Sequence, residues 1–280
     1  MFAPGIRGSK MLARSHRSPE RGTSTKHAAV LLPTLIAMAL LSSACPQPVV
    51  RVPVSTEDVI KSNQVALEAD LAFAKKDQYA ALIKYLEAGR LNPNSEYIQN
   101  KIGITYSQLK FYPDAASAFL RSIGLNPKYP YPYNNLGTVY FATADKKKAE
   151  RYFRKAISLN PNVASFHVNL GTLYFENKKF AKGMEEWKKG LALDPTVMGK
   201  NEGISLAAGG RGNPSEKSYF MARLYASMGD VVHAVESLQQ ALNAGFTNIA
   251  LIAQEKDFDP IRRDERFLEF MKTAAVITRP

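Results

Sequence analysis

Residues 130–163 of the chain read PYPYNNLGTVYFATADKKKAERYFRKAISLNPNV, and this stretch decides the fold. Its small residues Gly137, Ala149 and Ala156 occupy the eighth, twentieth and twenty-seventh positions, and Pro161 lies near its end. A shift of 34 residues in either direction brings up small residues and a proline at the same positions, without a gap. An in-phase period of this length indicates a helical repeat array.

The small residues and the prolines each have a physical role in such an array. Two helices pack closely only where small side chains let their ridges interlock. All fifteen of these positions in five candidate units are Gly, Ala or Ser. They are Ala69, Ala81 and Ala88; Gly103, Ala115 and Ser122; Gly137, Ala149 and Ala156; Gly171, Gly183 and Gly190; and Ala222, Ala234 and Ala241. Because proline moves the preceding residue out of the helical region, Pro93, Pro127, Pro161 and Pro195 should end every second helix.

The order of Leu136-Gly137, Tyr140, Ala149, Phe153, Ala156 and Pro161 resembles the signature of the tetratricopeptide repeat. This resemblance implies an all-α fold, a right-handed solenoid of about five helix-turn-helix repeats with a C-terminal capping helix. The repeats cover residues 62–95, 96–129, 130–163, 164–197 and 215–248, with a Gly-rich insert at 198–214 and a cap at 249–280. We expect the insert to interrupt the stacking, and Phe267, Leu268 and Met271 to cover the open end.

The N-terminal segment differs from the rest in charge and hydropathy. The chain holds 37 Lys and Arg residues against 25 Asp and Glu, and six of the basic residues lie in the first 27. An uncharged apolar run at 28–41 follows and ends shortly before Cys45, the only cysteine of the chain. This order predicts an export signal over residues 1–44, with translation starting at Met1 or Met11. A single cysteine excludes an intramolecular disulfide.

The residues before Cys45 resemble a bacterial lipoprotein box, which implies lipidation of Cys45 and attachment to a membrane through the lipid anchor. The box departs at Ser42, where leucine is usual, and ordinary cleavage after Ala44 would leave a soluble periplasmic protein. Because Pro46 rather than aspartate follows the cysteine, the resemblance favours the outer membrane, facing the periplasm. Residues 45–61 are predicted as a Pro-rich tether, within which a helical pattern begins at Thr56 or Asp58.

The basic clusters of the repeats favour no nucleic-acid partner. The triplet at 146–148 and the doublets at 178–179, 188–189 and 262–263 lie mainly in turns or on second helices. A nucleic-acid surface would need them on one face with interleaved aromatic residues, and the predicted export argues against that partner. A solvated outer face explains them, and contact with anionic envelope polymers is the alternative.

The sequence offers no catalytic or metal-binding constellation. His167 and His233 lie in separate units without a second ligand at helical spacing, and the neighbouring Glu185 and Glu186 diverge on a helix. Only 32 residues follow the last repeat, which leaves no room for a catalytic domain. We therefore expect a non-enzymatic binding scaffold without metal or cofactor.

The resemblance places a ligand groove on the concave surface, lined by the first helix of each unit. The groove residues so implied are Tyr97, Asn100, Ile104, Tyr131, Asn134, Asn135, Thr138, Phe141, Asn169, Thr172 and Phe175. Asparagine amides donate and accept hydrogen bonds, which suits a peptide backbone, and aromatic rings add apolar contact. Thr138 and Thr172 depart from the basic and amide residues of a carboxylate clamp. The double change Asn134→Ala with Tyr131→Ala is expected to weaken binding and leave the melting behaviour unchanged.

The function expected from these features is that of an adaptor for a protein or peptide segment during assembly of a cell-envelope complex, similar to tetratricopeptide lipoproteins of pilus and secretin biogenesis. The alternative is a soluble periplasmic binding module for peptidoglycan or another polymer, whose groove would need aromatic rings exposed for stacking.

Overall fold

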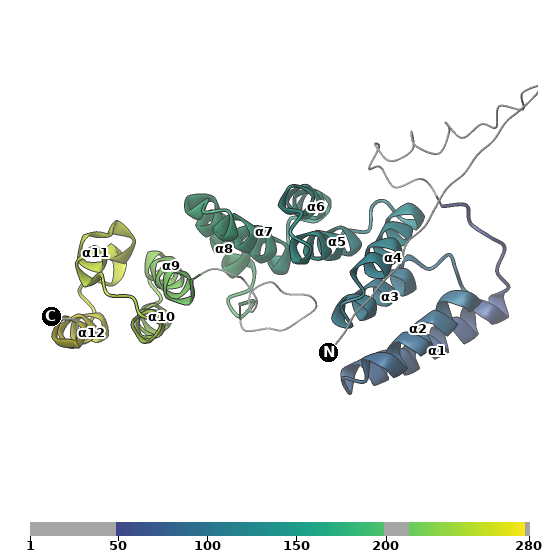
Figure 1. Ribbon diagram of the computed structural model, residues 1–280, viewed down its shortest axis with the longest axis horizontal. Coiled ribbons are helices and arrows are strands. Elements are labelled where there is room, and N and C mark those ends of the chain that lie inside the picture. The colour runs from purple at the N-terminus through teal and green to yellow at the C-terminus, as the bar shows by residue number, and fades with distance from the viewer. Residues whose placement is uncertain (1–48, 199–212, 278–280) are drawn as a thin grey trace, which may run out of the picture. The chain divides into compact units, whose positions relative to one another are not determined.

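The computed structural model describes residues 49–198 and 213–277, all within one compact unit that spans residues 46–280. The predicted signal segment, Cys45 and most of the Gly-rich insert lie outside the described residues. The described part contains helices and no strand, which confirms the all-α prediction. Figure 1 shows the helices following one another in antiparallel pairs.

Five helix pairs correspond to the five predicted units. The pairs are α1 (Thr56–Ala74) with α2 (Gln78–Leu91), α3 (Glu96–Gln108) with α4 (Tyr112–Leu125), α5 (Tyr131–Ala142) with α6 (Lys146–Leu159), α7 (Ala164–Glu176) with α8 (Phe180–Leu193), and α9 (Pro214–Ser227) with α10 (Val231–Asn243). The two helices of each pair pack together, and from α2 to α7 the second helix of one pair also packs against the first of the next.

All fifteen small positions of the repeat are buried, as the sequence predicts. The glycines show why size matters there. A Cβ on Gly103 would lie 2.5 Å from the ring of Phe119, and one on Gly171 would lie 2.3 Å from the ring of Trp187. Atoms cannot approach this closely, so the bulky residue of the second helix sits directly over a glycine of the first.

The second helices end where the prolines require. Helices α2, α4, α6 and α8 end at Leu91, Leu125, Leu159 and Leu193, two residues before each proline. The next residue is Asn or Asp, whose side-chain oxygen accepts a hydrogen bond from a backbone N–H two residues on, as in Asn92 to Asn94 and Asp194 to Thr196. These Asx turns give a hydrogen-bond acceptor to a backbone N–H where the chain reverses.

The turn inside each pair has one residue in the left-handed region, at the same repeat position. Lys76, Lys110, Ala144 and Lys178 have φ between 58° and 66°, and the fifth unit has Gly229 at the same position with φ 77°. L-residues with side chains pay a conformational cost in this left-handed region, and glycine does not. Four units therefore carry a small strain that the fifth avoids.

The start of the fold is tied down rather than extended into solvent. Helix α1 begins at Thr56, as the helical pattern predicts, with the Ser55 hydroxyl accepting from the Asp58 N–H at 3.0 Å. The extended part of the predicted tether therefore ends before residue 61. The Val52 N–H donates to the Asn94 amide oxygen at 3.1 Å, and the Asn94 amide donates to the Val52 carbonyl at 2.6 Å. The tether thus pairs with the turn after α2 before α1 begins.

The C-terminal cap consists of α11 (Ile249–Gln254), a 3₁₀ helix η2 (Lys256–Ile261) and α12 (Glu265–Ile277). Phe258, Phe267 and Phe270 are buried against α9 and α10, which confirms that this segment closes the array. One detail of the prediction is wrong: Leu268 is exposed, and Phe270 contacts the core in its place. Phe267 and Phe270 are three residues apart and share a helix face, whereas residue 268 is turned away.

Candidate functional site

Helices α3, α5 and α7 together line a cavity of about 600 Å³, here called the amide cavity. Seven of the eleven predicted groove residues line it. They are Tyr97, Asn100, Ile104, Tyr131, Asn134, Asn135 and Asn169. Each comes from the first helix of its pair, where spacings of three and four residues keep side chains on one face. The structure thus brings together most of the predicted groove.

Four asparagines of the amide cavity form a chain of hydrogen bonds across three helix pairs. The amide of Asn169 donates to the oxygen of Asn134 at 2.9 Å, and the amide of Asn135 donates to the oxygen of Asn100 at 3.0 Å. A longer bond of 3.4 Å from Asn134 to Asn135 joins the two halves. All four side chains are buried, so the bonds fix the amide orientations.

The two central asparagines of this hydrogen-bonded chain, Asn134 and Asn135, have donors and acceptors left for a ligand. An amide has two N–H donors and two acceptor lone pairs. Asn134 and Asn135 each use one donor and one acceptor within the chain. Each can therefore offer one donor and one acceptor to a ligand in the cavity, which is the pairing that a peptide group needs.

Burial of Asn134 corrects one expectation from the sequence. Its oxygen is the acceptor for Asn169, so its truncation removes a buried partner. An unsatisfied buried polar group costs about 1–3 kcal/mol. The change Asn134→Ala should therefore lower stability as well as binding, because these amides join successive repeats in addition to facing the cavity.

The predicted groove residues Thr138 and Thr172 do not line the amide cavity. Both are buried, and each hydroxyl donates to the backbone carbonyl four residues earlier, Asn134 at 3.2 Å and Val168 at 2.9 Å. A hydroxyl bonded to its own helix is turned along that helix. These two threonines are structural in this chain.

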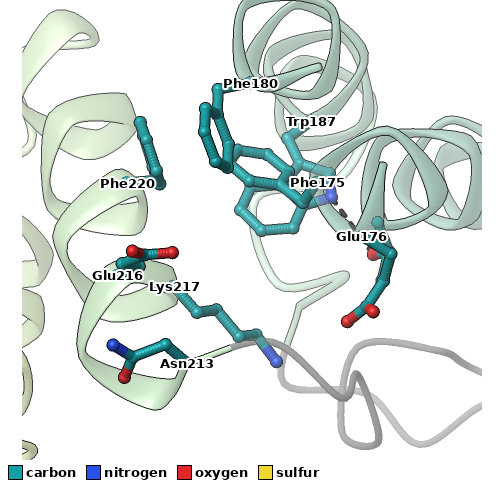
Figure 2. A pocket seen from close by; sticks show the side chains of 9 residues that line it. Phe175, Glu176, Phe180, Trp187, Asn213, Glu216, Lys217 and Phe220 are labelled. Carbon is teal, nitrogen blue, oxygen red and sulfur yellow. Dashed lines mark hydrogen bonds between the residues drawn. The ribbon is translucent and has the colours of Figure 1, made fainter. Parts of the chain in front are cut away.

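Phe141 and Phe175 also lie outside the amide cavity. Phe141 packs against the core formed by Phe153, Leu173 and their neighbours. Phe175 stacks on Trp187 with ring centroids 4.0 Å apart, and Phe220 of α9 lies 5.2 Å from Phe175. We call this group, completed by Phe180, the aromatic junction. Figure 2 shows its rings meeting where α9 faces α7 and α8.

The aromatic junction leaves little space. The pocket beside it measures about 50 Å³, room for a very small molecule at most. Phe180 and Phe220 stack with centroids 4.5 Å apart, so the fourth and fifth helix pairs contact each other although the Gly-rich insert separates them in sequence. The predicted interruption of the stacking is therefore bridged by aromatic rings.

The amide cavity carries little net charge. Lys101 and Asp194 are its charged lining residues, and Lys101 is held by Asp70 at 2.7 Å. Burial raises the pKa of Asp70, but hydrogen bonds from Lys101 and Tyr85 outweigh it and keep the pKa below its ordinary value. Burial also raises the pKa of Tyr129, which lines the cavity, to about 12. The carboxylate stays ionised, the phenol stays neutral, and the cavity favours an uncharged ligand.

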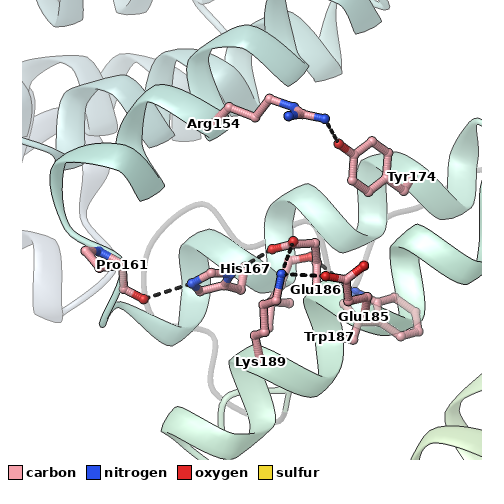
Figure 3. Close-up of polar contacts among 9 residues, drawn as sticks. Arg154, Pro161, His167, Tyr174, Glu185, Glu186, Trp187 and Lys189 are labelled. Carbon is pink, nitrogen blue, oxygen red and sulfur yellow. Dashed lines mark hydrogen bonds and ion pairs between the residues drawn. The ribbon is translucent and has the colours of Figure 1, made fainter.

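Helix α7, which contributes to both regions, is held to α8 by a partly buried ion pair. His167 Nδ1 lies 2.7 Å from Glu186 and its Nε2 lies 2.8 Å from the Pro161 carbonyl (Figure 3). Both partners are acceptors, so both ring nitrogens must donate and the ring is an imidazolium. The hydrogen bond to Glu186 raises the pKa of His167 above its ordinary value. Lys189 bonds the same carboxylate at 2.9 Å.

Sequence reasoning missed the cavity residues that lie in or next to the turns between pairs. Asn162, Val163, Phe166, Leu193 and Val197 line it in addition to the first-helix residues. They sit around the turns between pairs, and the proline after each second helix was read only as a stop signal. The same prolines lie in the turns that border the cavity. The 34-residue period predicts where these turns fall in the sequence, but not that they face the cavity.

The described residues contain no helix long and apolar enough to cross a membrane. Within the same residues, no group of three or more His, Cys, Asp or Glu side chains is placed to hold a metal ion.

Residues 130–163 match the family model of the tetratricopeptide repeat. No curated protein sequence matches the chain. A solved thermophilic TPR protein of Thermus thermophilus is 18% identical, with 77% of this chain and 99% of that one covered and a TM-score of 0.48.

PilF of Pseudomonas aeruginosa is 16% identical, with 73% and 82% covered and a TM-score of 0.48. The first TPR of Spaghetti, solved bound to an HSP90 peptide, is 18% identical, with 45% and 97% covered and a TM-score of 0.42. Residues 130–163 thus match one tetratricopeptide repeat, and the helix pairs on both sides continue its 34-residue period.

Proposed function

We propose that this protein is an exported, lipid-anchored adaptor that binds a segment of a protein in the amide cavity during assembly of a cell-envelope complex. The tetratricopeptide fold is a scaffold for protein or peptide partners, which supports the general function. The observation that carries the specific site is the asparagine chain, because it presents oriented amide groups inside a cavity of about 600 Å³.

The cavity chemistry fits an uncharged, extended peptide segment. Asn134 and Asn135 can pair with backbone amide groups, and the rings of Tyr97 and Tyr131 remain partly exposed beside them. The carbonyl and N–H of a peptide group need both a donor and an acceptor, which an amide provides. Because the side chains are already held in place, binding does not carry the entropic cost of ordering them.

The proposed export and anchoring rest on the N-terminal sequence. The basic segment, the apolar run at 28–41 and Cys45 follow the order of a lipoprotein signal, and Pro46 in place of aspartate favours the outer membrane. Several acyl chains anchor a protein stably where one chain does so only marginally. The pilus and secretin setting is an analogy with other tetratricopeptide lipoproteins.

Fatty-acid labelling in the native cell tests the anchor. Wild-type protein should incorporate label and need detergent for release, whereas Cys45→Ala should incorporate none. Equal labelling of both proteins, or wild-type protein released without detergent, contradicts the lipid anchor and leaves binding to be tested separately.

Site-specific photo-crosslinking tests the binding site. A photo-reactive residue replacing Tyr131 in the cavity should capture a protein in the native envelope. The same residue replacing Tyr79 is the matched control, because that tyrosine is exposed on α2 and lies outside the cavity lining. Capture of the same partner from both positions with equal yield would place binding elsewhere.

The same experiment separates the second candidate, a module that binds an envelope polymer. The partly exposed rings of Tyr97 and Tyr131 are the observation that favours it, since sugars stack on aromatic faces. A captured product that resists protease and is released by a muramidase would support the polymer, and a protease-sensitive product supports the adaptor.

A further inference from the structure

Helix α1 exposes a row of apolar side chains at the start of the array. Ile60, Leu67 and Leu71 are 55%, 63% and 58% exposed. They lie on the side of the helix opposite Ala69, which packs on α2. Contiguous exposed apolar residues on one helix mark an interaction surface more often than isolated ones do.

The other repeats show what normally covers this row. The residues that occupy the position of Leu71 in the next three units are Thr105, Val139 and Leu173, and all three are buried. Their helices α3, α5 and α7 pack against the second helix of the preceding pair. Within the described residues α1 has no preceding pair, so its equivalent face lacks that cover.

The opposite end of the array does not supply a partner for this face. There α11, η2 and α12 close the last pair, and Phe267 and Phe270 are buried beneath them. A head-to-tail contact between two copies would have to displace this cap. The face on α1 is therefore matched more simply by the same face of a second copy, in an isologous contact.

The spacing of the row is self-complementary. Residues 60, 64, 67 and 71 alternate steps of four, three and four, which keeps them on one seam of a helix pair. If two such helices lie antiparallel about a two-fold axis between residues 65 and 66, Ile60 faces Leu71 of the second copy and Gln64 faces its Leu67. All four positions of the seam are exposed in one copy.

The charges at the two ends of α1 favour this antiparallel direction. Glu57 and Asp58 lie in the first turn, whereas Lys75 and Lys76 follow the last turn. Antiparallel pairing brings the acidic end of one helix beside the basic end of the other. Parallel pairing would set like charges together, which is unfavourable.

We propose that the protein forms an isologous dimer through the α1 seam, defined by Ile60, Gln64, Leu67 and Leu71, with the two helices antiparallel. The proposal is independent of the ligand of the amide cavity, which α3, α5 and α7 line. Dimerisation would give one assembly two cavities, and a partner with two binding segments would then bind more tightly through avidity.

The oligomeric state of the full chain tests the dimer. Light scattering after size-exclusion chromatography should give the mass of two chains for Cys45→Ser protein in detergent, with the detergent mass subtracted. Leu67→Glu with Leu71→Glu should raise the dimer dissociation constant at least about tenfold, because each copy would bury two carboxylates in the seam.

Ile83→Glu is the matched control, since Ile83 is equally apolar and is 66% exposed on the neighbouring helix α2. It should leave the dimer intact, and circular dichroism should show both variants folded. A wild-type monomer overturns the proposal, including a monomer whose α1 face is covered by its own chain. Dissociation by Ile83→Glu equal to that of the seam variant also overturns it.

Cysteine pairing tests the register. In the Cys45→Ser background, a mixture of Gln64→Cys chains and Leu67→Cys chains should form the mixed disulfide in preference to either homodisulfide, because residues 64 and 67 face each other. Predominant pairing of Gln64→Cys with itself would indicate a parallel seam and contradict the proposed arrangement.

Discussion

The amide cavity and the aromatic junction both include first-helix residues, but the cavity leaves an open space and the junction fills it. In α3 and α5 the first-helix residues surround an open space of about 600 Å³, and in α7 the later residues Thr172 and Phe175 fill a region with about 50 Å³ left. The difference follows from the residue opposite. Phe175 meets Trp187 at 4.0 Å and Phe220 beyond it, whereas Tyr131 contacts Phe166 at 5.6 Å and stays 44% exposed beside the amide cavity. The neighbouring helix pair therefore decides whether a first-helix side chain borders an open space or is packed.

The largest effect is expected at the aromatic junction. Trp187 is buried, stacks on Phe175 and covers Gly171. Trp187→Ala should lower the free energy of unfolding by about 3–5 kcal/mol, because large aromatic truncations leave a cavity. Denaturant unfolding measures this loss. Tyr131→Ala is the control from the amide cavity, and a loss as large as that of Trp187→Ala would mean that the two regions do not differ in packing.

The ion pair of His167 lies on the helix that the two regions share, so its loss should affect both. The pKa of His167 is raised in the folded state. The contribution of the ion pair to stability is therefore fully present below the pKa of an unfolded histidine, about 6.5, and is lost as the pH rises through the pKa of folded His167. His167→Ala should lower stability by about 1.5–3 kcal/mol on the acidic side of that range and less above it.

Urea unfolding across pH checks this expectation. Burial raises the pKa of Glu186, but hydrogen bonds from His167 and Lys189 bring it below its ordinary value, so the carboxylate stays charged through the range of interest. His233→Ala is the control, because His233 is exposed, its side chain hydrogen-bonds Asp230 beside it in sequence, and its ring stacks on Tyr225. A wild-type stability that does not fall between mildly acidic and alkaline pH would contradict the assignment of the imidazolium.

The asparagine chain should contribute a smaller stabilisation confined to the amide cavity. Asn169→Ala removes the donor to Asn134 and should cost about 1–3 kcal/mol. Asn162→Ala is the matched control, because Asn162 lines the same cavity with an exposed side chain. Equal stability losses for the two variants would show that the hydrogen bonds between the asparagines contribute no more to stability than an exposed side chain does.

The smallest effect concerns the turns. Lys110 has φ 64° in the turn between α3 and α4, where the fifth unit already has Gly229. Lys110→Gly should raise the free energy of unfolding by less than about 1 kcal/mol, because relief of strain exceeds the added chain entropy. Ser117→Gly, on the exposed face of α4, should lower it by about 0.5–1 kcal/mol. If both glycine variants changed the free energy of unfolding in the same direction, the strain at Lys110 would be contradicted.

Much of the fold follows from sequence because the repeat fixes each element several times over. The small residues Gly137, Ala149 and Ala156 and the terminal Pro161 predict where the helices of one unit begin, pack and end, and the same set recurs 34 residues away. The strained turn residue was not predicted, since lysine and alanine there give no sign of a positive φ. Leu268 was misplaced because a terminal helix has no second copy to fix its register.

The sequence predicts several of the side chains that face the cavity, but not what each of them contacts. First-helix positions placed Asn134 and Asn135 in the cavity, but the period does not say that Asn169 bonds Asn134 one repeat away. Phe175 occupies the position of Phe141 one unit later, and both rings are packed outside the amide cavity, Phe141 in the core and Phe175 on Trp187. The period does not predict the contact of Phe175 with Phe220, which lies 45 residues on along the chain and belongs to another pair.

The affinity for the captured partner of a cavity variant and of a matched surface variant tests the central claim most directly. Tyr131→Ala with Asn134→Ala should weaken binding by more than about tenfold, since an aromatic anchor and an amide pair are both lost. Tyr79→Ala with Asn63→Ala removes the same side chains from exposed positions on α2 and α1 and should bind as wild type. A cavity variant that remains folded and binds with undiminished affinity would contradict the claim that the amide cavity is the binding site.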